Sequence, residues 1–280
     1  MAIPVPSTAA GRDGLAALLA RPERAVIALD FDGTLAEIVP DPEQARAHPA
    51  AVPALAALAP LVGTVLVLTG RPAEVAVGYG GFADVPGLEH LVVLGHYGAE
   101  RWDAATGHLR APEPHPGVAA AQAELAEVFA RAGAADGTWV EDKGRAIAVH
   151  TRRAADPRGA FEALRGPLDA LADRHGLIVE PGRLVLELRP PGMDKGVALD
   201  EFVREVDAEA VLYAGDDLGD VAAFEAVERR RSQGLPGLLV GSGSAEVTAL
   251  AERADLVVDG PRGVVDLLSS LAHELRLSAP

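Results

Sequence analysis

Short apolar runs recur along the chain, and segments with a helical pattern separate them. The runs are rich in Val, Leu and Ile and lie at 25–30, 64–69, 91–95, 210–215, 237–241 and 255–259. Helical patterns lie at 49–60, 72–79, 196–206, 218–230, 244–252 and 263–275. Continuous apolar strands that alternate with helices are typical of a parallel sheet covered on both faces.

The pattern changes between residues 102 and 189. After a proline-rich segment come a helical stretch at 118–132 and a longer one at 157–175, together with two strand pairs. The pairs are "TWVEDKG" with "RAIAVHTR", and "LIVE" with "LVLELR". This pattern indicates a small α+β unit with an antiparallel sheet. We therefore predict an α/β core of residues 1–101 and 190–280, an inserted domain at 102–189, and disorder over the first dozen residues.

Composition narrows the function classes. The formal net charge of −16 argues against nucleic acid or an anionic membrane surface as a partner. No apolar stretch approaches the roughly 18 residues of a membrane span, and the N-terminal segment lacks the pattern of a secretory signal. The chain has no cysteine, so a cytoplasmic location is expected. Of its 25 basic residues, Lys143 and Lys195 are the two lysines, which suggests a specific role for each.

Four polar segments fall at or near the carboxyl ends of predicted strands, where parallel sheets bind ligands. Taken alone, each is explained by a turn or a helix cap. Together they indicate phosphoryl transfer at a magnesium ion. Their chemically active residues are Asp30 and Asp32; Thr69, Gly70 and Arg71; Lys195; and Asp216, Asp217 and Asp220.

Magnesium prefers oxygen ligands and keeps several waters. The protein ligands can be the carboxylates of Asp30 and Asp216 and the backbone carbonyl of Asp32. Asp217 and Asp220 can hydrogen-bond to these ligands or to the metal-bound waters. A divalent cation also explains how so many carboxylates lie together.

A bound phosphate needs donors for its oxygens. The Thr69 hydroxyl, the Lys195 ammonium and backbone N–H groups near Gly33 and Gly70 can provide them. Because residues two apart on an extended segment face the same side, Asp30 and Asp32 can both approach one phosphoryl group. One carboxylate can attack phosphorus, and the other can protonate the leaving alcohol and then accept a proton from water.

The order "DFDGTL", "LTGR", "DKG", "GDDLGD" resembles the four motifs of the haloacid dehalogenase superfamily of phosphatases. The resemblance implies a Rossmann-like parallel-sheet core with an inserted α+β cap domain. It also implies Asp30 as nucleophile, Asp32 as general acid and base, Thr69 and Lys195 as phosphate ligands, and Asp216 as a metal ligand.

The inserted segment is similar to that of trehalose-6-phosphate phosphatases, through "GAERW", "VEDKGRAIAVHTR" and "EPGRLVLELRPPGMDKG". This similarity, over roughly 25 to 225, implies a cap domain that binds glucose hydroxyls through Glu141, Lys143 and Glu187. The sequence departs from the family pattern at Tyr97 and Gly219, where histidine and threonine are usual. Further candidates for the substrate cleft are Arg71, Glu100, Arg101, His150, Arg152 and Arg183.

The sequence thus predicts a Mg²⁺-dependent hydrolase of trehalose 6-phosphate. Two alternatives remain open: a phosphatase of another sugar phosphate, such as sucrose phosphate or a glycosyl phosphoglycerate, and an inactive partner that regulates a trehalose-phosphate synthase. The resemblance also allows functional pairing of an active enzyme with such a synthase. The oligomeric state stays open, with a monomer slightly favoured.

Overall fold

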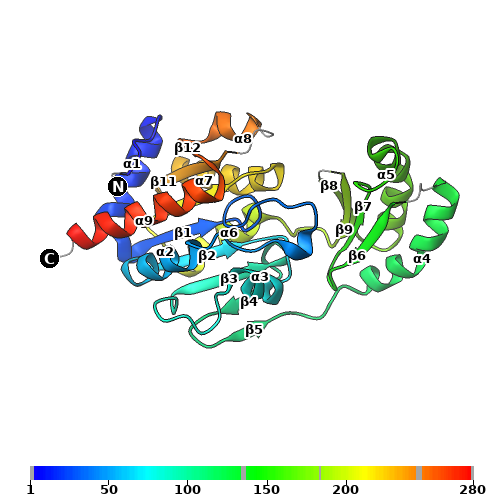
Figure 1. Cartoon of the computed structure of the whole chain (residues 1–280), viewed down its shortest axis with the longest axis horizontal. Coiled ribbons are helices and arrows are strands. Elements are labelled where there is room, and N and C mark those ends of the chain that lie inside the picture. Colours follow the sequence, from blue (N-terminus) through cyan, green and yellow to red (C-terminus); the bar gives the residue numbers. More distant parts are fainter. Residues whose placement is uncertain (1–2, 134–136, 183, 244–247, 279–280) are drawn as a thin grey trace. The chain divides into compact units, whose positions relative to one another are not determined.

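The computed structural model describes residues 3–133, 137–182, 184–243 and 248–278, which divide into two compact units (Figure 1). The first unit takes in the described residues up to Ala111 and from Asp194 onward, and the second runs from Pro112 to Met193. The divisions lie at 111/112 and 193/194, whereas the sequence pattern suggested 101/102 and 189/190.

Among the described residues, the first unit contains an eight-stranded sheet in the order β12-β11-β10-β1-β2-β3-β4-β5. The parallel strands are β1 (Ala25–Leu29), β2 (Thr64–Leu68), β3 (Leu91–Gly95), β10 (Ala210–Gly215), β11 (Gly237–Ser242) and β12 (Leu256–Val258). Each of these six strands matches a predicted apolar run. Every residue of β1 is buried, as expected of a strand covered on both faces.

Helices cover both faces of this sheet because side chains alternate along each strand. Ile27 and Leu29 of β1 join one apolar cluster, and Val26 and Ala28 join another. The first cluster includes residues of α1 (Ala9–Ala20), α2 (Ala51–Leu58), α3 (Ala73–Gly80) and α9 (Gly260–Ser278). The second includes residues of α6 (Lys195–Glu205), α7 (Val221–Ser232) and α8 (Thr248–Arg253).

The prediction of disorder over the first dozen residues was wrong from residue 9 onward, where α1 begins. Ala and Leu dominate this helix and favour it, and Thr8 caps its first turn. Asp255, which is 1% exposed, fastens this segment to the sheet. Its carboxylate accepts hydrogen bonds from Thr8, Arg231 and the N–H of Leu239, and its carbonyl accepts the N–H of Ser7 at 2.7 Å.

Two short strands were not predicted. β4 (Glu100–Asp103) and β5 (His108–Arg110) continue the sheet beyond β3 in antiparallel pairing. Trp102 of β4 is buried in the same cluster as Ile27. The sheet therefore extends past residue 101, where the sequence pattern placed the start of the insert.

The second unit has a four-stranded antiparallel sheet in the order β6-β7-β9-β8 within its described residues. Its elements are α4 (Pro116–Ala132), β6 (Trp139–Asp142), β7 (Ile147–His150), α5 (Pro157–Arg174), β8 (Ile178–Gly182) and β9 (Val185–Arg189). The two helices share an apolar cluster with Ile147, Val149, Leu186 and Leu188. The alternate side chains of β7 and β9 are therefore directed to the opposite face, which confirms the predicted α+β pattern.

Short 3-10 turns complete the described elements at 22–24, 42–44, 59–61, 96–98 and 218–220. Within the described ranges, no helix combines the length and the apolar character that crossing a membrane requires.

Candidate active site

The functional residues predicted for the first unit meet at the carboxyl edge of its parallel sheet. Strands β10, β1 and β2 are neighbours, so the residues that follow them lie close together. Asp216, Asp30 and Thr69 follow these strands in that order. The N–H of Asp30 donates to the carbonyl of Ala214 at 2.9 Å, which continues the β1–β10 ladder up to the carboxylate.

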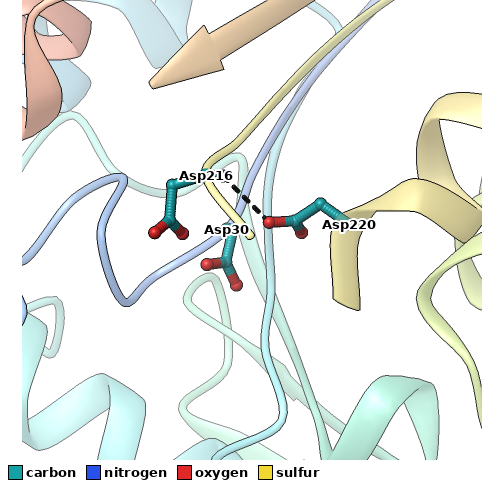
Figure 2. Close-up of side chains that lie close together, drawn as sticks. All are labelled: Asp30, Asp216 and Asp220. Carbon is teal, nitrogen blue, oxygen red and sulfur yellow. Dashed lines mark hydrogen bonds between the residues drawn. The ribbon is translucent and has the colours of Figure 1, made fainter. Parts of the chain in front are cut away.

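Three buried carboxylates converge at this edge (Figure 2). Asp30, Asp216 and Asp220 each offer one oxygen, and these oxygens lie within 4.8 Å of one another. Gly33 makes room for them, since a Cβ at that position would lie 2.0 Å from Asp216 Oδ2. Its φ of +76° also favours glycine. The glycine of the first motif therefore shapes the site as well as the turn.

Lys195 supplies a positive charge inside this cluster. It is the first residue of α6 and is 5% exposed. Its Nζ donates to Asp30 Oδ1 at 2.5 Å and to Asp220 Oδ1 at 2.7 Å. Burial alone would lower the pKa of Lys195, but the carboxylates of Asp220 and Asp30 raise that pKa well above its ordinary value. The side chain is therefore a charged ammonium.

Asp220 accepts four hydrogen bonds. Its Oδ2 accepts the N–H groups of Asp216 at 2.9 Å and Asp217 at 3.2 Å. Its Oδ1 accepts the Lys195 ammonium at 2.7 Å and the Tyr213 hydroxyl at 2.6 Å. A carboxylate has about four acceptor positions, so these donors occupy all of them. Asp220 therefore holds the loop and the ammonium in place, and it is a poor direct metal ligand.

Sequence reasoning missed Tyr213. The residue is fully buried in β10, and its ring packs edge-on against Phe224 at 6.0 Å between centroids. Burial, followed by the negative charge of Asp220, raises the pKa of Tyr213 well above its ordinary value, so the hydroxyl stays a neutral donor. The signal in the sequence was its hydroxyl, the one polar side-chain group in the apolar run "AVLYAG".

The carboxylates are unfavourable together without a cation. Burial raises the pKa of Asp30 well above its ordinary value; Lys195 opposes this rise, and Asp220 and Asp216 add to it. Burial and then the charges of Asp217 and Asp220 raise the pKa of Asp216 to about 8. A divalent cation bound to carboxylate oxygens removes this repulsion. Asp30 and Asp216 therefore fit the predicted role of direct ligands.

Asp217 is exposed and has a local role as well. Its Oδ1 accepts the N–H of Gly219 at 2.8 Å and caps the 3-10 turn at 218–220. Gly219, which departs from the family pattern, thus contributes a backbone donor where threonine is usual.

The segment after β2 contributes a hydroxyl and a guanidinium. Thr69 is 1% exposed, and its Oγ1 accepts the N–H of Arg71 at 3.1 Å, which leaves the hydroxyl hydrogen to be donated elsewhere. Arg71 Nε and one terminal nitrogen donate to the two carboxylate oxygens of Asp32, each at 2.7 Å. The structure thus pairs two residues to which the sequence assigned separate roles.

His96 and Tyr97 lie beside this segment in left-handed backbone conformations, with φ of 47° and 56°. Such conformations cost of order 1 kcal/mol each and often mark functional sites. The N–H of Tyr97 donates to the carbonyl of Thr69 at 3.0 Å. Its phenol packs against Gly70, where a Cβ would lie 2.7 Å from the hydroxyl oxygen. The family departure at Tyr97 therefore borders the candidate phosphate loop.

Glu100 and Arg101 contact neighbouring elements of the first unit. Glu100 is buried, and its Oε2 accepts the N–H of Ala73 at 2.8 Å at the start of α3. Arg101 donates to Asp103 at 3.0 Å and to Glu205 at 2.6 Å. These contacts fix strand β4 and helix α6, and they give no support to a role in substrate binding.

The second unit carries a row of glutamates across its sheet. Register aligns Glu141 with Ala148, Ala148 with Glu187, and Glu187 with Glu180. Each glutamate contacts a basic side chain of the same unit. The pairs are Glu141 with His150 at 2.8 Å, Glu187 with Lys143 at 2.5 Å and Glu180 with Arg189 at 2.8 Å.

The sequence had predicted Glu141, His150, Glu187 and Lys143. The structure pairs Glu187 with Lys143 through an ion pair and Glu141 with His150 through a hydrogen bond. Glu187 is 5% exposed, and among the described residues its buried Oε1 has no hydrogen-bond partner, so this oxygen keeps unused acceptor positions. Arg152 is exposed. Arg183 lies outside the described residues.

Glu180 and Arg189 were missed. In an antiparallel pair, residues equally far from the connection lie opposite each other. Because Gly182 pairs with Val185, Glu180 lies opposite Glu187, two residues further along each strand.

Comparisons with known proteins agree with this arrangement. The family model described as trehalose-phosphatase matches residues 28–255. A trehalose-phosphate phosphatase of Mycobacterium avium is 34% identical over 275 residues, and one of Mycobacterium marinum is 33% identical over 262. The matches cover 95% and 90% of this chain but 65% and 62% of the relatives, so the chain spans under two thirds of their length.

A solved structure of Aspergillus fumigatus trehalose-6-phosphate phosphatase is similar with a TM-score of 0.64 and 26% identity, over 96% of this chain and 99% of that one. A lower-identity neighbour titled a haloacid dehalogenase-like hydrolase, from Bacteroides thetaiotaomicron, shares the fold with a TM-score of 0.58, 15% identity and coverage of 87% and 98%. The match of the family model to most of its length, together with the ordered motifs at one sheet edge, shows that the chain belongs to the trehalose-phosphatase family.

Proposed function

We propose that this chain is a Mg²⁺-dependent phosphatase that hydrolyses trehalose 6-phosphate to trehalose and phosphate. The observation that carries the proposal is the buried contact of Lys195 with Asp30 beside Asp216, at the carboxyl edge of the sheet. The similarity to the two mycobacterial trehalose-phosphate phosphatases supports the choice of substrate.

The first half of the reaction transfers the phosphoryl group to the protein. An oxygen of Asp30 attacks phosphorus while the bond from phosphorus to the sugar oxygen breaks. Asp32 donates a proton to that departing oxygen, so trehalose leaves as an alcohol.

The second half returns the protein to its starting state. Asp32 accepts a proton from a water molecule as the water oxygen bonds to phosphorus. The bond between phosphorus and Asp30 breaks, which releases phosphate and regenerates the carboxylate. One residue serves as acid and then as base, so no proton is left over.

The remaining residues hold the phosphate. The Lys195 ammonium, the Thr69 hydroxyl and backbone N–H groups near Gly33 and Gly70 provide donors for its oxygens. Asp30, Asp216 and the Asp32 carbonyl would hold Mg²⁺, which would neutralise part of the phosphate charge. Asp217 and Asp220 would hold these ligands, or waters bound to the ion, in place without binding the ion themselves.

We assign substrate specificity to the second unit, residues 112–193, as a cap domain. Glu141, Lys143 and Glu187 are the proposed partners of the glucose hydroxyls. The unpartnered oxygen of Glu187 supports this role, because a site built to bond a hydroxyl discriminates strongly against ligands that lack it.

The test is phosphate release from a panel of esters, with Mg²⁺ and with EDTA. The panel contains trehalose 6-phosphate, sucrose 6-phosphate, glucosyl phosphoglycerate and glucose 6-phosphate. We expect Mg²⁺-dependent release with a clear preference for trehalose 6-phosphate, and none from Asp30→Asn. If another ester is preferred, that ester replaces trehalose 6-phosphate as the proposed substrate. If the wild-type chain releases no phosphate from any ester, the result favours the alternative of an inactive regulatory partner.

A further inference from the structure

Arg71 and Asp32 form a planar, bidentate ion pair in the first unit. The Nε and a terminal nitrogen of Arg71 each lie 2.7 Å from a different oxygen of Asp32. The Arg71 side chain is 14% exposed and that of Asp32 is 40% exposed. Parallel hydrogen bonds of this kind fix the plane of a carboxylate, which a single contact with lysine does not.

Arg71 is itself held from several directions. Its N–H donates to Thr69 Oγ1 at 3.1 Å, and its carbonyl accepts the N–H of His96 at 2.9 Å. Its guanidinium carbon lies 5.8 Å from the centre of the Phe31 ring, a distance at which a cation and a ring attract each other. These contacts hold the guanidinium of Arg71 in place, so it can fix the orientation of the more exposed Asp32 carboxylate.

Asp32 needs such a fixed partner. Its side chain is 40% exposed although Phe31 and Gly33 on either side are buried, and without a partner a partly exposed carboxylate can rotate among several orientations. Proton transfer requires the acid within hydrogen-bond reach of the departing oxygen. Each carboxylate oxygen has two acceptor positions, so the pair with Arg71 leaves one on each oxygen for a proton.

We propose that Arg71 is the positioning residue of the acid and base Asp32, and that it acts on the leaving group through that carboxylate. This inference rests on the proposed function, and it differs from the sequence-based expectation that Arg71 binds the substrate. A residue that binds the sugar would chiefly raise the KM for trehalose 6-phosphate, whereas a residue that positions the acid lowers kcat and leaves KM within about 2-fold, so kcat and KM are measured separately.

The experiment compares kcat/KM of Arg71→Ala for trehalose 6-phosphate and for p-nitrophenyl phosphate. A sugar alkoxide needs a proton to depart, whereas p-nitrophenolate is stable without one. The first value should fall by about 100-fold, within the usual range for general acid catalysis. The second should fall by no more than about 3-fold, because nucleophilic attack by Asp30 is unaffected.

Two further variants test the bidentate geometry. Arg71→Lys keeps the charge but has one nitrogen, so it should retain the selective loss. Guanidinium ion added to Arg71→Ala should recover part of the trehalose 6-phosphate activity and leave p-nitrophenyl phosphate hydrolysis unchanged.

The matched control is Arg253→Ala. Arg253 makes the same kind of bidentate pair with Glu228, through its Nε at 3.2 Å and a terminal nitrogen at 2.6 Å. Its loss should leave both kcat/KM values within about 2-fold of wild type, which is the expectation for a surface ion pair.

An equal loss for both substrates would overturn the inference, because a phosphate ligand or a folding defect affects them alike. A selective loss for trehalose 6-phosphate that appears in KM at unchanged kcat would also overturn it, because it would mean that Arg71 binds the sugar. If the wild type prefers another sugar phosphate, the proposed substrate fails, and the same comparison with that ester still decides the role of Arg71. If the wild type hydrolyses neither class of ester, the proposed function and this inference both fail.

Discussion

The Lys195 ammonium lies 2.5 Å from the Asp30 carboxylate, although 165 residues separate the two in the chain. Asp30 directly follows β1, and Lys195 is the first residue of α6, the helix that comes after the second unit in the chain. A point charge on a flexible stem fits this buried position between two carboxylates. Because a guanidinium is larger and planar, the contact explains why lysine stands here in an arginine-rich chain.

Lys195→Arg should lower kcat by more than about 100-fold, the usual effect of losing one preorganised donor. Initial rates of phosphate release measure this loss. Arg204→Lys is the control, because it makes the reverse exchange at an exposed position of the same helix and should leave kcat unchanged. Turnover near wild type in Lys195→Arg would contradict the role of the ammonium.

Tyr213→Phe should lower kcat by about 10-fold, since a hydrogen bond to a charged group contributes about 1.5–3 kcal/mol. Removing the hydroxyl frees Asp220 Oδ1 to move and so loosens its contact with Lys195. The KM should stay within about 2-fold, because the ring still fills its place. Ser270→Ala removes a buried hydroxyl that donates to the carbonyl of Asp266 within α9, and it should change neither constant. A rise in KM at unchanged kcat would argue against this support role.

Mg²⁺ should raise the melting temperature of the wild-type chain by roughly 5 °C at a hundredfold excess over its dissociation constant. Asp216→Asn should abolish that rise. In EDTA the variant should melt at or above the wild-type temperature, because it removes one of several buried, mutually repelling carboxylates. Asp103→Asn, at an ion pair with Arg101, should keep the Mg²⁺ effect. A Mg²⁺ effect of full size in Asp216→Asn would show that the ion binds elsewhere.

Glu187→Gln should raise the KM for trehalose 6-phosphate by about 10-fold, equivalent to about 1.4 kcal/mol. Glutamine keeps the shape but removes the charge that strengthens a bond to a sugar hydroxyl. Hydrolysis of p-nitrophenyl phosphate, which has no sugar, should not change. Glu124→Gln provides the comparison, since Glu124 pairs with Arg174 and His175 in the same unit. An equal rise in KM for both substrates would mean that Glu187 does not bind the sugar.

Most of the fold followed from hydrophobic pattern, because strands buried on both faces are apolar throughout. β4 and β5 escaped prediction since each is short, and polar residues flank the one buried tryptophan. The helix at Ala9–Ala20 was missed as well: its composition and the Thr8 cap favour a helix, but the contact with Asp255 that holds it on the sheet comes from the far end of the sequence. Long-range partners of this kind leave no local signal.

The candidate site could be predicted as a set of residues but not as a set of contacts. Strand ends placed Asp30, Asp32, Thr69 and Asp216 at one edge of the sheet. No pattern in the sequence selects the side-chain orientations that pair Arg71 with Asp32 or that fill every acceptor position of Asp220. Those depend on rotamers that packing selects after the backbone is in place.

The fastening of α1 by Asp255 has a practical consequence for expression of the chain. Trimming the chain to begin at residue 21 would remove Ser7 and Thr8, leaving the buried carboxylate without one of its donors. It would also remove Leu18, which is fully buried, and so expose the apolar side chains of the cluster that Leu18 joins. Such a truncation would look harmless in the sequence and would reduce solubility. Affinity tags and cleavage sites therefore belong ahead of Ser7, with the capped helix left intact.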